Sequence, residues 1–244
     1  MTGTGRLKAS GTIKLGLLKS ELSIYVDVKS SMRIAICPLP GPLCQADIIV
    51  PTECSDNTGL PHCLEHLIFM GSNNYPVRGY LDKLANLCIA QGTNAWTDRD
   101  HTAYSAVTAG KEGLLRLLPV FLDHVLRPTL TEPQFQTEIY HVDGDGKQGG
   151  VVFCEMQGRE STEDDLSDNA VHGLLYPTSG YRFECGGLTP DIATLSNEQV
   201  RAYHARFYQA SNCILLLHGA VTAQDVEDVL RAHEDLVPPL DPLV

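Results

Sequence analysis

Positions 58–72 of the chain read Thr-Gly-Leu-Pro-His-Cys-Leu-Glu-His-Leu-Ile-Phe-Met-Gly-Ser. Pro61 is typical of the first turn of a helix, so we predict that a helix begins there. On this helix His62 and His66 would lie one turn apart on the same face, where two imidazoles can bind one metal ion. Glu65 follows His62 by three residues, so it faces the same side and can reach a water molecule at that ion.

These three residues form the H-x-x-E-H pattern, the reverse of the H-E-x-x-H motif of many zinc proteases. A simpler interpretation is a solvated helix face, on which the imidazoles only make hydrogen bonds. The apolar neighbours argue against it, because Leu64, Leu67 and Ile68 predict a largely buried helix. Polar side chains enter such a helix only with partners, so metal binding is favoured.

A catalytic zinc ion needs a third protein ligand and leaves one position open for water. We predict that the ligand is Glu155, in the apolar stretch Gly-Val-Val-Phe-Cys-Glu-Met at 150–156, because a carboxylate buried there would need a cation. His101 and His141 are alternative ligands in more polar surroundings. Five acidic residues further on are expected only to be solvated: Glu160, Glu163, Asp164, Asp165 and Asp168.

The composition narrows the class of protein. The chain has 244 residues, of which 43% are hydrophobic, enough for one large domain with a sizeable core. Its formal net charge is −12, which argues against a nucleic-acid partner, since such proteins present a basic surface. No apolar run approaches the roughly 18–20 residues of a transmembrane helix, so we expect no membrane span.

The cysteines and the N-terminal residues bear on the compartment. Eight cysteines are scattered without a C-x-x-C pair, which favours free thiols in a reducing interior. Cys63 and Cys154 each flank a predicted ligand, and we expect both to be core thiols. Residues 1–20 hold four basic residues and no acidic residue, as mitochondrial presequences do, but four glycines oppose an amphipathic helix. We therefore predict a cytoplasmic location, with the mitochondrial matrix as the alternative.

Hydrophobic periodicity and turn signals predict an α+β fold, in which helices pack on a mixed, largely antiparallel sheet. We expect a flexible N-terminal arm over 1–21, one domain over 22–236 and a linker-like tail over 237–244. The predicted strands are two over 22–36, one over 44–51, a hairpin over 93–109 and one over 213–219. The predicted helices cover 61–71, 78–90, 111–126, a segment capped at 131–134, 151–160, 163–175, 196–208 and 222–236.

Three motifs in this order resemble the N-terminal catalytic domain of the pitrilysin/insulysin metallopeptidases. They are the helix around His62, the segment Gly-Thr-Asn-Ala-Trp-Thr at 92–97 and the segment at 150–156. Tyr-His-Ala-Arg-Phe-Tyr at 203–208 is similar to a later part of the same domain. The resemblance covers roughly residues 22–236 and is closest to presequence proteases and their cytosolic relatives.

The resemblance implies a zinc-dependent endopeptidase with a Zn²⁺ ion bound by His62, His66 and Glu155. Glu65 would be the catalytic base, and Asn94 and Ala95 would lie on an edge strand that holds an extended peptide. It also implies a larger enzyme, in which four similar domains form two halves around a chamber that admits short unfolded peptides. This chain would be the first quarter, so further domains or a second chain would complete the active site.

Two other functions remain open from the sequence. S-ribosylhomocysteine lyases have a related fold and a histidine-rich helix, but their chains are smaller and their third ligand is a cysteine. Core subunits of respiratory complexes use the fold as a structural or peptide-binding scaffold with a degraded motif. The intact motif here favours the peptidase.

Overall fold

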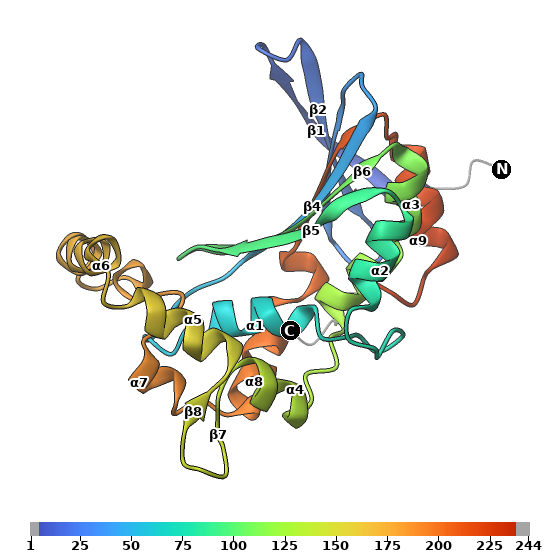
Figure 1. Ribbon diagram of the computed structural model, residues 1–244. Helices are drawn as coiled ribbons and strands as arrows, with labels where there is room; N and C mark the ends of the chain where they lie inside the picture. Colours follow the sequence, from blue (N-terminus) through green and yellow to red (C-terminus); the bar gives the residue numbers. More distant parts are fainter. Residues whose placement is uncertain (1–4, 238–244) are drawn as a thin grey trace.

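The computed structural model describes residues 5–237, whose main feature is a seven-stranded sheet with helices gathered on one side (Figure 1). The strands of the sheet are β1 (Leu7–Leu15), β2 (Ser20–Asp27), β3 (Arg33–Pro38), β4 (Leu43–Pro51), β5 (Ala90–Thr97), β6 (His101–Ala109) and β9 (Ile214–Gly219). Their spatial order is β1-β2-β3-β9-β4-β6-β5. Only the β3–β9 pair is parallel, so the predicted α+β class with a largely antiparallel sheet is confirmed.

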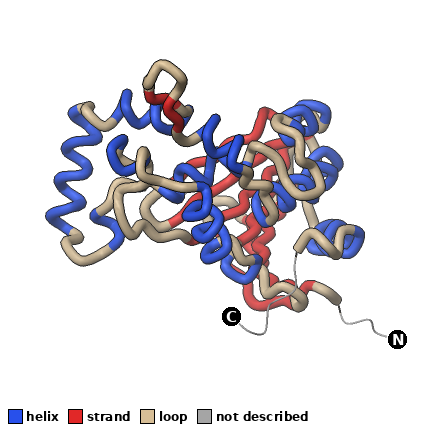
Figure 2. The backbone as a smooth tube through the Cα atoms, turned by 90° about the horizontal axis from the view of Figure 1, so that it is seen from below, coloured by secondary structure: helices blue, strands red, loops and turns tan. Residues whose placement is uncertain are grey.

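Most helices lie on one face of this sheet, in front of its strands when the molecule is seen from below, whereas α6 projects to one side (Figure 2). The helices are α1 (Leu60–Ile68), α2 (Tyr80–Leu87), α3 (Lys111–Leu126), α4 (Glu132–Glu138), α5 (Val151–Arg159), α6 (Glu163–Leu175), α7 (Thr189–Ile192), α8 (Asn197–Phe207) and α9 (Ala223–Ala232). Two 3₁₀ turns, η1 (Gly180–Arg182) and η2 (Ala210–Asn212), and a small hairpin of β7 (His141–Val142) and β8 (Gln148–Gly149) complete the fold.

The core lies between the sheet and the helices, as the alternation along β4 shows. Cys44, Ala46, Ile48 and Val50 are buried toward the helices, whereas Gln45 on the opposite face is only half-buried. The period of two places every second side chain on the same face of a strand. Helix α3 packs on β4 and β6, and α1 contacts β5 and β6, so the helix with the H-x-x-E-H pattern lies against the edge of the sheet.

Most predicted elements are present within a few residues of their predicted ends, including the capping box of Thr131 and Gln134 at the start of α4. The predicted flexible arm is wrong. Residues 7–15 form β1, which pairs with β2 along its whole length, and β2 itself begins at Ser20. The predicted tail falls almost wholly on residues 238–244, outside the described part of the chain.

Buried contacts hold this N-terminal strand in place. The Arg6 side chain donates hydrogen bonds to both carboxylate oxygens of Asp27, at 2.8 and 3.1 Å, and to the Leu230 carbonyl. The backbone N–H of Arg6 also donates to Glu227 of α9, at 2.8 Å. Among the described residues, no helix has the length and apolarity that a bilayer crossing requires.

Candidate metal centre

Helix α1 brings the two histidines together. It begins after Gly59, whose φ of 70° is left-handed, and Pro61 stands in its first turn as predicted. The imidazole rings of His62 and His66 lie edge to face with their centroids 4.9 Å apart. The apolar side of the helix is fully buried, through residues that include Cys63, Leu64, Leu67 and Ile68. The helix is thus fixed in the core while its histidines face a neighbouring helix.

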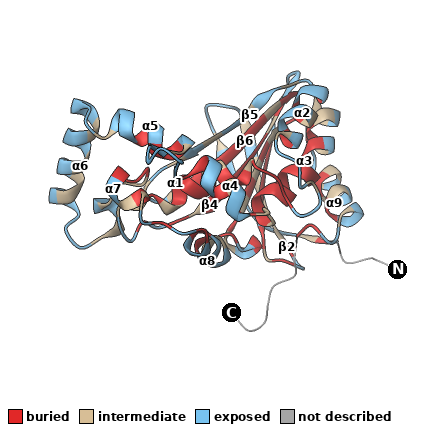
Figure 3. Cartoon of the chain, turned by 60° about the horizontal axis from the view of Figure 1, so that its bottom comes forward, coloured by how far each residue is buried: buried red, intermediate tan, exposed pale blue. Residues whose placement is uncertain are grey.

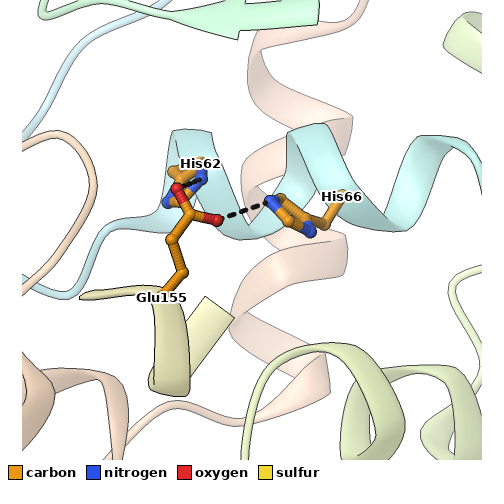
Figure 4. A group of neighbouring side chains, drawn as sticks. All are labelled: His62, His66 and Glu155. Carbon is orange, nitrogen blue, oxygen red and sulfur yellow. Dashed lines mark ion pairs between the residues drawn. The ribbon is translucent and has the colours of Figure 1, made fainter. Parts of the chain in front are cut away.

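That neighbour is α5, which supplies Glu155 (Figure 4). One carboxylate oxygen of Glu155 is 3.7 Å from Nε2 of His62, and the other is 3.6 Å from Nε2 of His66. One ligand atom from each residue lies within 4.8 Å of the others, a spacing that could accommodate a metal ion. The structure therefore joins the three predicted ligands, although 89 residues separate His66 from Glu155 in the sequence.

The predicted burial of Glu155 is wrong, because 39% of its side chain is exposed. Helix α5 buries Val152, Phe153 and Met156, and its period turns Cys154 and Glu155 outward. Cys154 is accordingly an exposed thiol rather than a core thiol, whereas Cys63 is buried as predicted. The apolar stretch correctly predicts a packed helix but not which of its residues face the core.

Each histidine also has a partner at its other ring nitrogen, Nδ1. Nδ1 of His62 lies 3.2 Å from the carbonyl oxygen of Gly186. Nδ1 of His66 lies 3.8 Å from a carboxylate oxygen of Glu138, whose side chain is only 7% exposed and whose other oxygen is 2.9 Å from Arg78. Metal-binding histidines usually donate their second N–H to a carbonyl or carboxylate, which fixes the ring and its tautomer.

Burial lowers the pKa of His62, and the neighbouring His66 lowers it further. The lowered pKa favours the neutral imidazole, the form that binds metals. Glu65 lies beside this pair, and its carboxylate accepts a hydrogen bond of 2.6 Å from the Thr97 hydroxyl. Burial raises the pKa of Glu65, although the Thr97 hydrogen bond acts in the opposite direction.

Strand β5 passes over this cluster and ends the strand order, since within residues 5–237 it pairs only with β6. Asn94 and Ala95 on β5 line a cavity of about 350 Å³ together with Glu65 and His66. A second cavity of about 250 Å³ lies toward Thr97 and is also lined by Glu65. Glu65 thus stands where the two cavities meet below the free edge of the sheet.

The alternative ligands lie elsewhere. His101 is 2.7 Å from Asp100 and accepts a hydrogen bond from Trp96 at 3.2 Å, and His141 belongs to the exposed β7. Within residues 5–237, the one group of three or more His, Cys, Asp or Glu side chains close enough to hold an ion is the His62, His66 and Glu155 cluster.

The acidic residues after α5 are more than solvated charges. Asp165 pairs with Arg159 at 3.3 Å, and Asp168 pairs with Arg99 at 2.9 Å. Glu160 accepts hydrogen bonds from the backbone and hydroxyl of Thr189, at 2.9 and 2.7 Å. Three of the five predicted solvated acids thus hold parts of the fold together.

Comparison with known proteins places this geometry in a family. Residues 51–149 match the insulinase domain of peptidase family M16, and residues 194–243 match the M16 inactive domain. The chain belongs to peptidase family M16. It is the N-terminal domain of that family and is related to presequence proteases, so the resemblance noted from the motifs is confirmed.

An uncharacterized Caenorhabditis elegans protein is 41% identical over 217 residues, 88% of this chain and 22% of that protein. The mitochondrial presequence protease of Xenopus laevis is 30% identical over 188 residues, 74% of this chain and 18% of that protein. The chain thus spans about a fifth of these relatives. The pitrilysin crystal structure shares the fold, with a TM-score of 0.74 at 14% identity over 97% of this chain and 25% of pitrilysin.

Proposed function

We propose that this M16 domain is a zinc-dependent endopeptidase domain that acts on short unfolded peptides. The observation that carries the proposal is the convergence of His62, His66 and Glu155 beside the carboxylate of Glu65. Two imidazoles and one carboxylate are a ligand set of catalytic zinc sites in peptidases, in which a fourth position stays open. When bound, zinc would polarise the scissile carbonyl and acidify a water molecule.

Glu65 is the proposed catalytic base. Its carboxylate takes a proton from the attacking water and then delivers that proton to the leaving amine, a transfer typically worth 10²–10⁴-fold in rate. The hydrogen bond from Thr97 holds one carboxylate oxygen in place. The other oxygen is free to face the water and the substrate.

The free edge of β5 is the proposed peptide-binding site. An extended peptide can pair with Asn94 and Ala95 through backbone hydrogen bonds, which give affinity with broad sequence tolerance. The cavities on the two sides of Glu65 would each accept a substrate side chain next to the scissile bond.

The extra length of the relatives suggests what completes the site. We propose that further similar domains, or a second chain, enclose the peptide and add substrate contacts, so that the 244-residue chain alone is a slow peptidase. For the location, the prediction from the sequence stays cytoplasmic, with the mitochondrial matrix as its alternative. The mitochondrial presequence proteases among the relatives favour the matrix alternative.

The alternative function is a non-catalytic member of the same family. The match of residues 194–243 to the M16 inactive domain favours it, but those residues supply no member of the cluster. A lyase-like function has no such support, because a glutamate stands where the lyases have a cysteine.

Peptide cleavage tests the proposal. The purified chain, loaded with zinc, is incubated for a long time with short unstructured peptides, and the products are identified by mass spectrometry. We expect slow cleavage that a chelator stops and zinc restores. Glu65→Gln keeps the shape of the side chain but removes the base, so zinc should stay bound while cleavage falls about 10²–10⁴-fold.

Three results would count against it. Cleavage that is unchanged in the Glu65→Gln variant would show that Glu65 is not the base. Loss of zinc from that variant would make Glu65 a ligand instead. A zinc-loaded wild-type chain that cleaves nothing, even when further domains of a full-length relative are added, would favour the non-catalytic alternative.

A further inference from the structure

The hydrogen bond behind His62 depends on a backbone carbonyl. The oxygen of Gly186 can only accept, so the 3.2 Å contact requires that Nδ1 of His62 carries the proton. Nε2 is then the unprotonated nitrogen, and it faces Glu155. The position of this one carbonyl therefore decides whether His62 presents a lone pair to the cluster.

The segment that carries the carbonyl lies very close to the start of α1. A Cβ atom added to Gly59 would stand 2.4 Å from the oxygen of Gly186 and 2.7 Å from Cα of Gly187. No side chain fits such a gap. The backbone at Gly186 is thus set directly against the helix that carries His62.

Asn57 holds both ends of this segment, once through its side chain and once through its backbone carbonyl, and the Glu184 side chain holds the middle. The Asn57 side-chain oxygen accepts a hydrogen bond from the N–H of Glu184, at 3.0 Å, and the Asn57 carbonyl accepts one from the N–H of Leu188, at 2.9 Å. The Glu184 carboxylate folds back and accepts a hydrogen bond from the N–H of Gly186, at 3.0 Å. The peptide unit before Gly186 is therefore held from its N–H side, while the carbonyl after it faces His62.

Glu184 is itself held in a protected place. Its second carboxylate oxygen lies 3.8 Å from the guanidinium of Arg99, whose side chain is only 9% exposed. Arg99 stands in the turn between β5 and β6. The residue that orients Gly186 is thus connected to the end of the edge strand.

We propose that Glu184 is a positioning residue for the metal centre. It holds the Gly186 carbonyl so that His62 keeps its Nδ1–H tautomer and presents Nε2 to the ion. This role rests on the proposed zinc-dependent function but concerns a residue outside the H-x-x-E-H pattern and the third-ligand segment.

Zinc affinity gives the first test, measured on the full chain by competition with a chromophoric chelator. Glu184→Ala removes the acceptor for the Gly186 N–H, and we expect zinc affinity to fall about 10–100-fold, as for other groups that support metal ligands. Glu184→Gln keeps an acceptor oxygen and should recover most of the affinity. Melting curves of the zinc-free proteins show whether each variant is folded.

Glu160→Ala is the matched control. Glu160 also accepts hydrogen bonds from the backbone of this region, at Thr189, but it does not touch Gly186. We expect its loss to leave zinc affinity unchanged, even if it lowers the melting temperature.

The tautomer of His62 gives a second test that needs no metal. Long-range ¹H–¹⁵N NMR spectra of the zinc-free chain should show a proton on Nδ1 of His62 in the wild type and in Glu184→Gln. In Glu184→Ala the spectra should show a mixture of the Nδ1–H and Nε2–H tautomers of His62. A wild-type chain that binds no zinc but shows this response would refute the proposed function, while the role of Glu184 in fixing the His62 tautomer would stand. Equal zinc affinity and an unchanged tautomer in a folded Glu184→Ala variant would overturn the proposal.

Discussion

At the scale of residues, His62 and His66 each direct one ring nitrogen to Glu155 and the other to a group from a different segment. The pair itself was predictable, because the spacing of two residues on one helix determines that they share a face. The supporting groups Gly186 and Glu138 were not, because they come from loops and helices distant in sequence. No local pattern marks a carbonyl or a carboxylate as the partner of one particular imidazole.

Glu155 shows a second limit of sequence reasoning. Its apolar neighbours suggested a buried acid, yet the helix period turns it outward, and it reaches the cluster from the exposed side of α5. The residue was identified through the resemblance to a family motif and through an argument about burial that the structure contradicts. The burial argument therefore does not support the choice of Glu155, which rests on the resemblance and on the distances to His62 and His66.

The exposure of Cys154 predicts its reactivity. Thiol reagents attack accessible thiolates, so iodoacetamide should modify Cys154 well before Cys63, whose pKa is raised by complete burial. Peptide mapping by mass spectrometry measures the order of modification, and Cys154→Ser should remove the fastest reaction. Earlier labelling of Cys63 in the folded chain would mean that α1 opens readily or packs differently.

At the scale of elements, turn and cap signals predicted most helices and strands, because proline, glycine and capping residues act locally. Strand β1 was missed, since its sequence, with Lys8, Gly11 and Lys14, shows no clear alternation, and most of its residues are exposed. Its place depends on β2 and on the buried pair of Arg6 and Asp27, which is a contact between distant positions. The strand is formed by its partners rather than by its own composition.

The Arg6–Asp27 pair should therefore stabilise this end of the sheet. Breaking a buried ion pair by removing one charge typically costs about 3–5 kcal/mol, so Asp27→Asn should lower the free energy of unfolding by about that amount at pH 7. Urea denaturation measures the change. Lys29→Ala, which removes an exposed pair with Glu234, is the control and should change stability little.

The Asp27→Asn variant also tests how the free energy of unfolding depends on pH. Burial alone would raise the pKa of Asp27, but hydrogen bonds from Arg6 and Ser30 outweigh it and hold that pKa below its usual value. A lowered pKa stabilises the fold fully above the unfolded value of about 3.9, and the effect is lost as the pH falls toward the folded value. The gap between wild type and variant should thus shrink below about pH 4. A gap that stays constant as the pH falls below that value would contradict this account.

At the scale of the whole molecule, α6 is an amphipathic helix whose orientation is the reverse of the usual one. Its polar side faces the protein, where Asp165 pairs with Arg159 and Asp168 with Arg99. Its apolar side is open, with Leu174 82% exposed beside Leu166, Val171 and Leu175, and Figure 3 shows the helix without buried residues. Periodicity predicted this helix but not which of its sides faces the protein, because that depends on arginines from other elements.

An exposed apolar face favours association, so the isolated 244-residue chain should self-associate with increasing concentration. The double variant Leu174→Glu and Leu175→Glu should shift it toward monomer in sedimentation velocity runs. Leu17→Glu, which changes an exposed leucine away from α6, in the turn between β1 and β2, should have no such effect. A wild-type chain that stays monomeric at the highest concentration reached would contradict the prediction.

The zinc content of the chain tests the central claim most directly. After dialysis against zinc and then against metal-free buffer, elemental analysis should find one zinc ion per wild-type chain. His62→Ala, His66→Ala and Glu155→Ala should each lose it while remaining folded by circular dichroism. A wild-type chain without bound zinc, or a folded Glu155→Ala or His62→Ala variant that retains one tightly bound ion, would contradict the assigned metal centre.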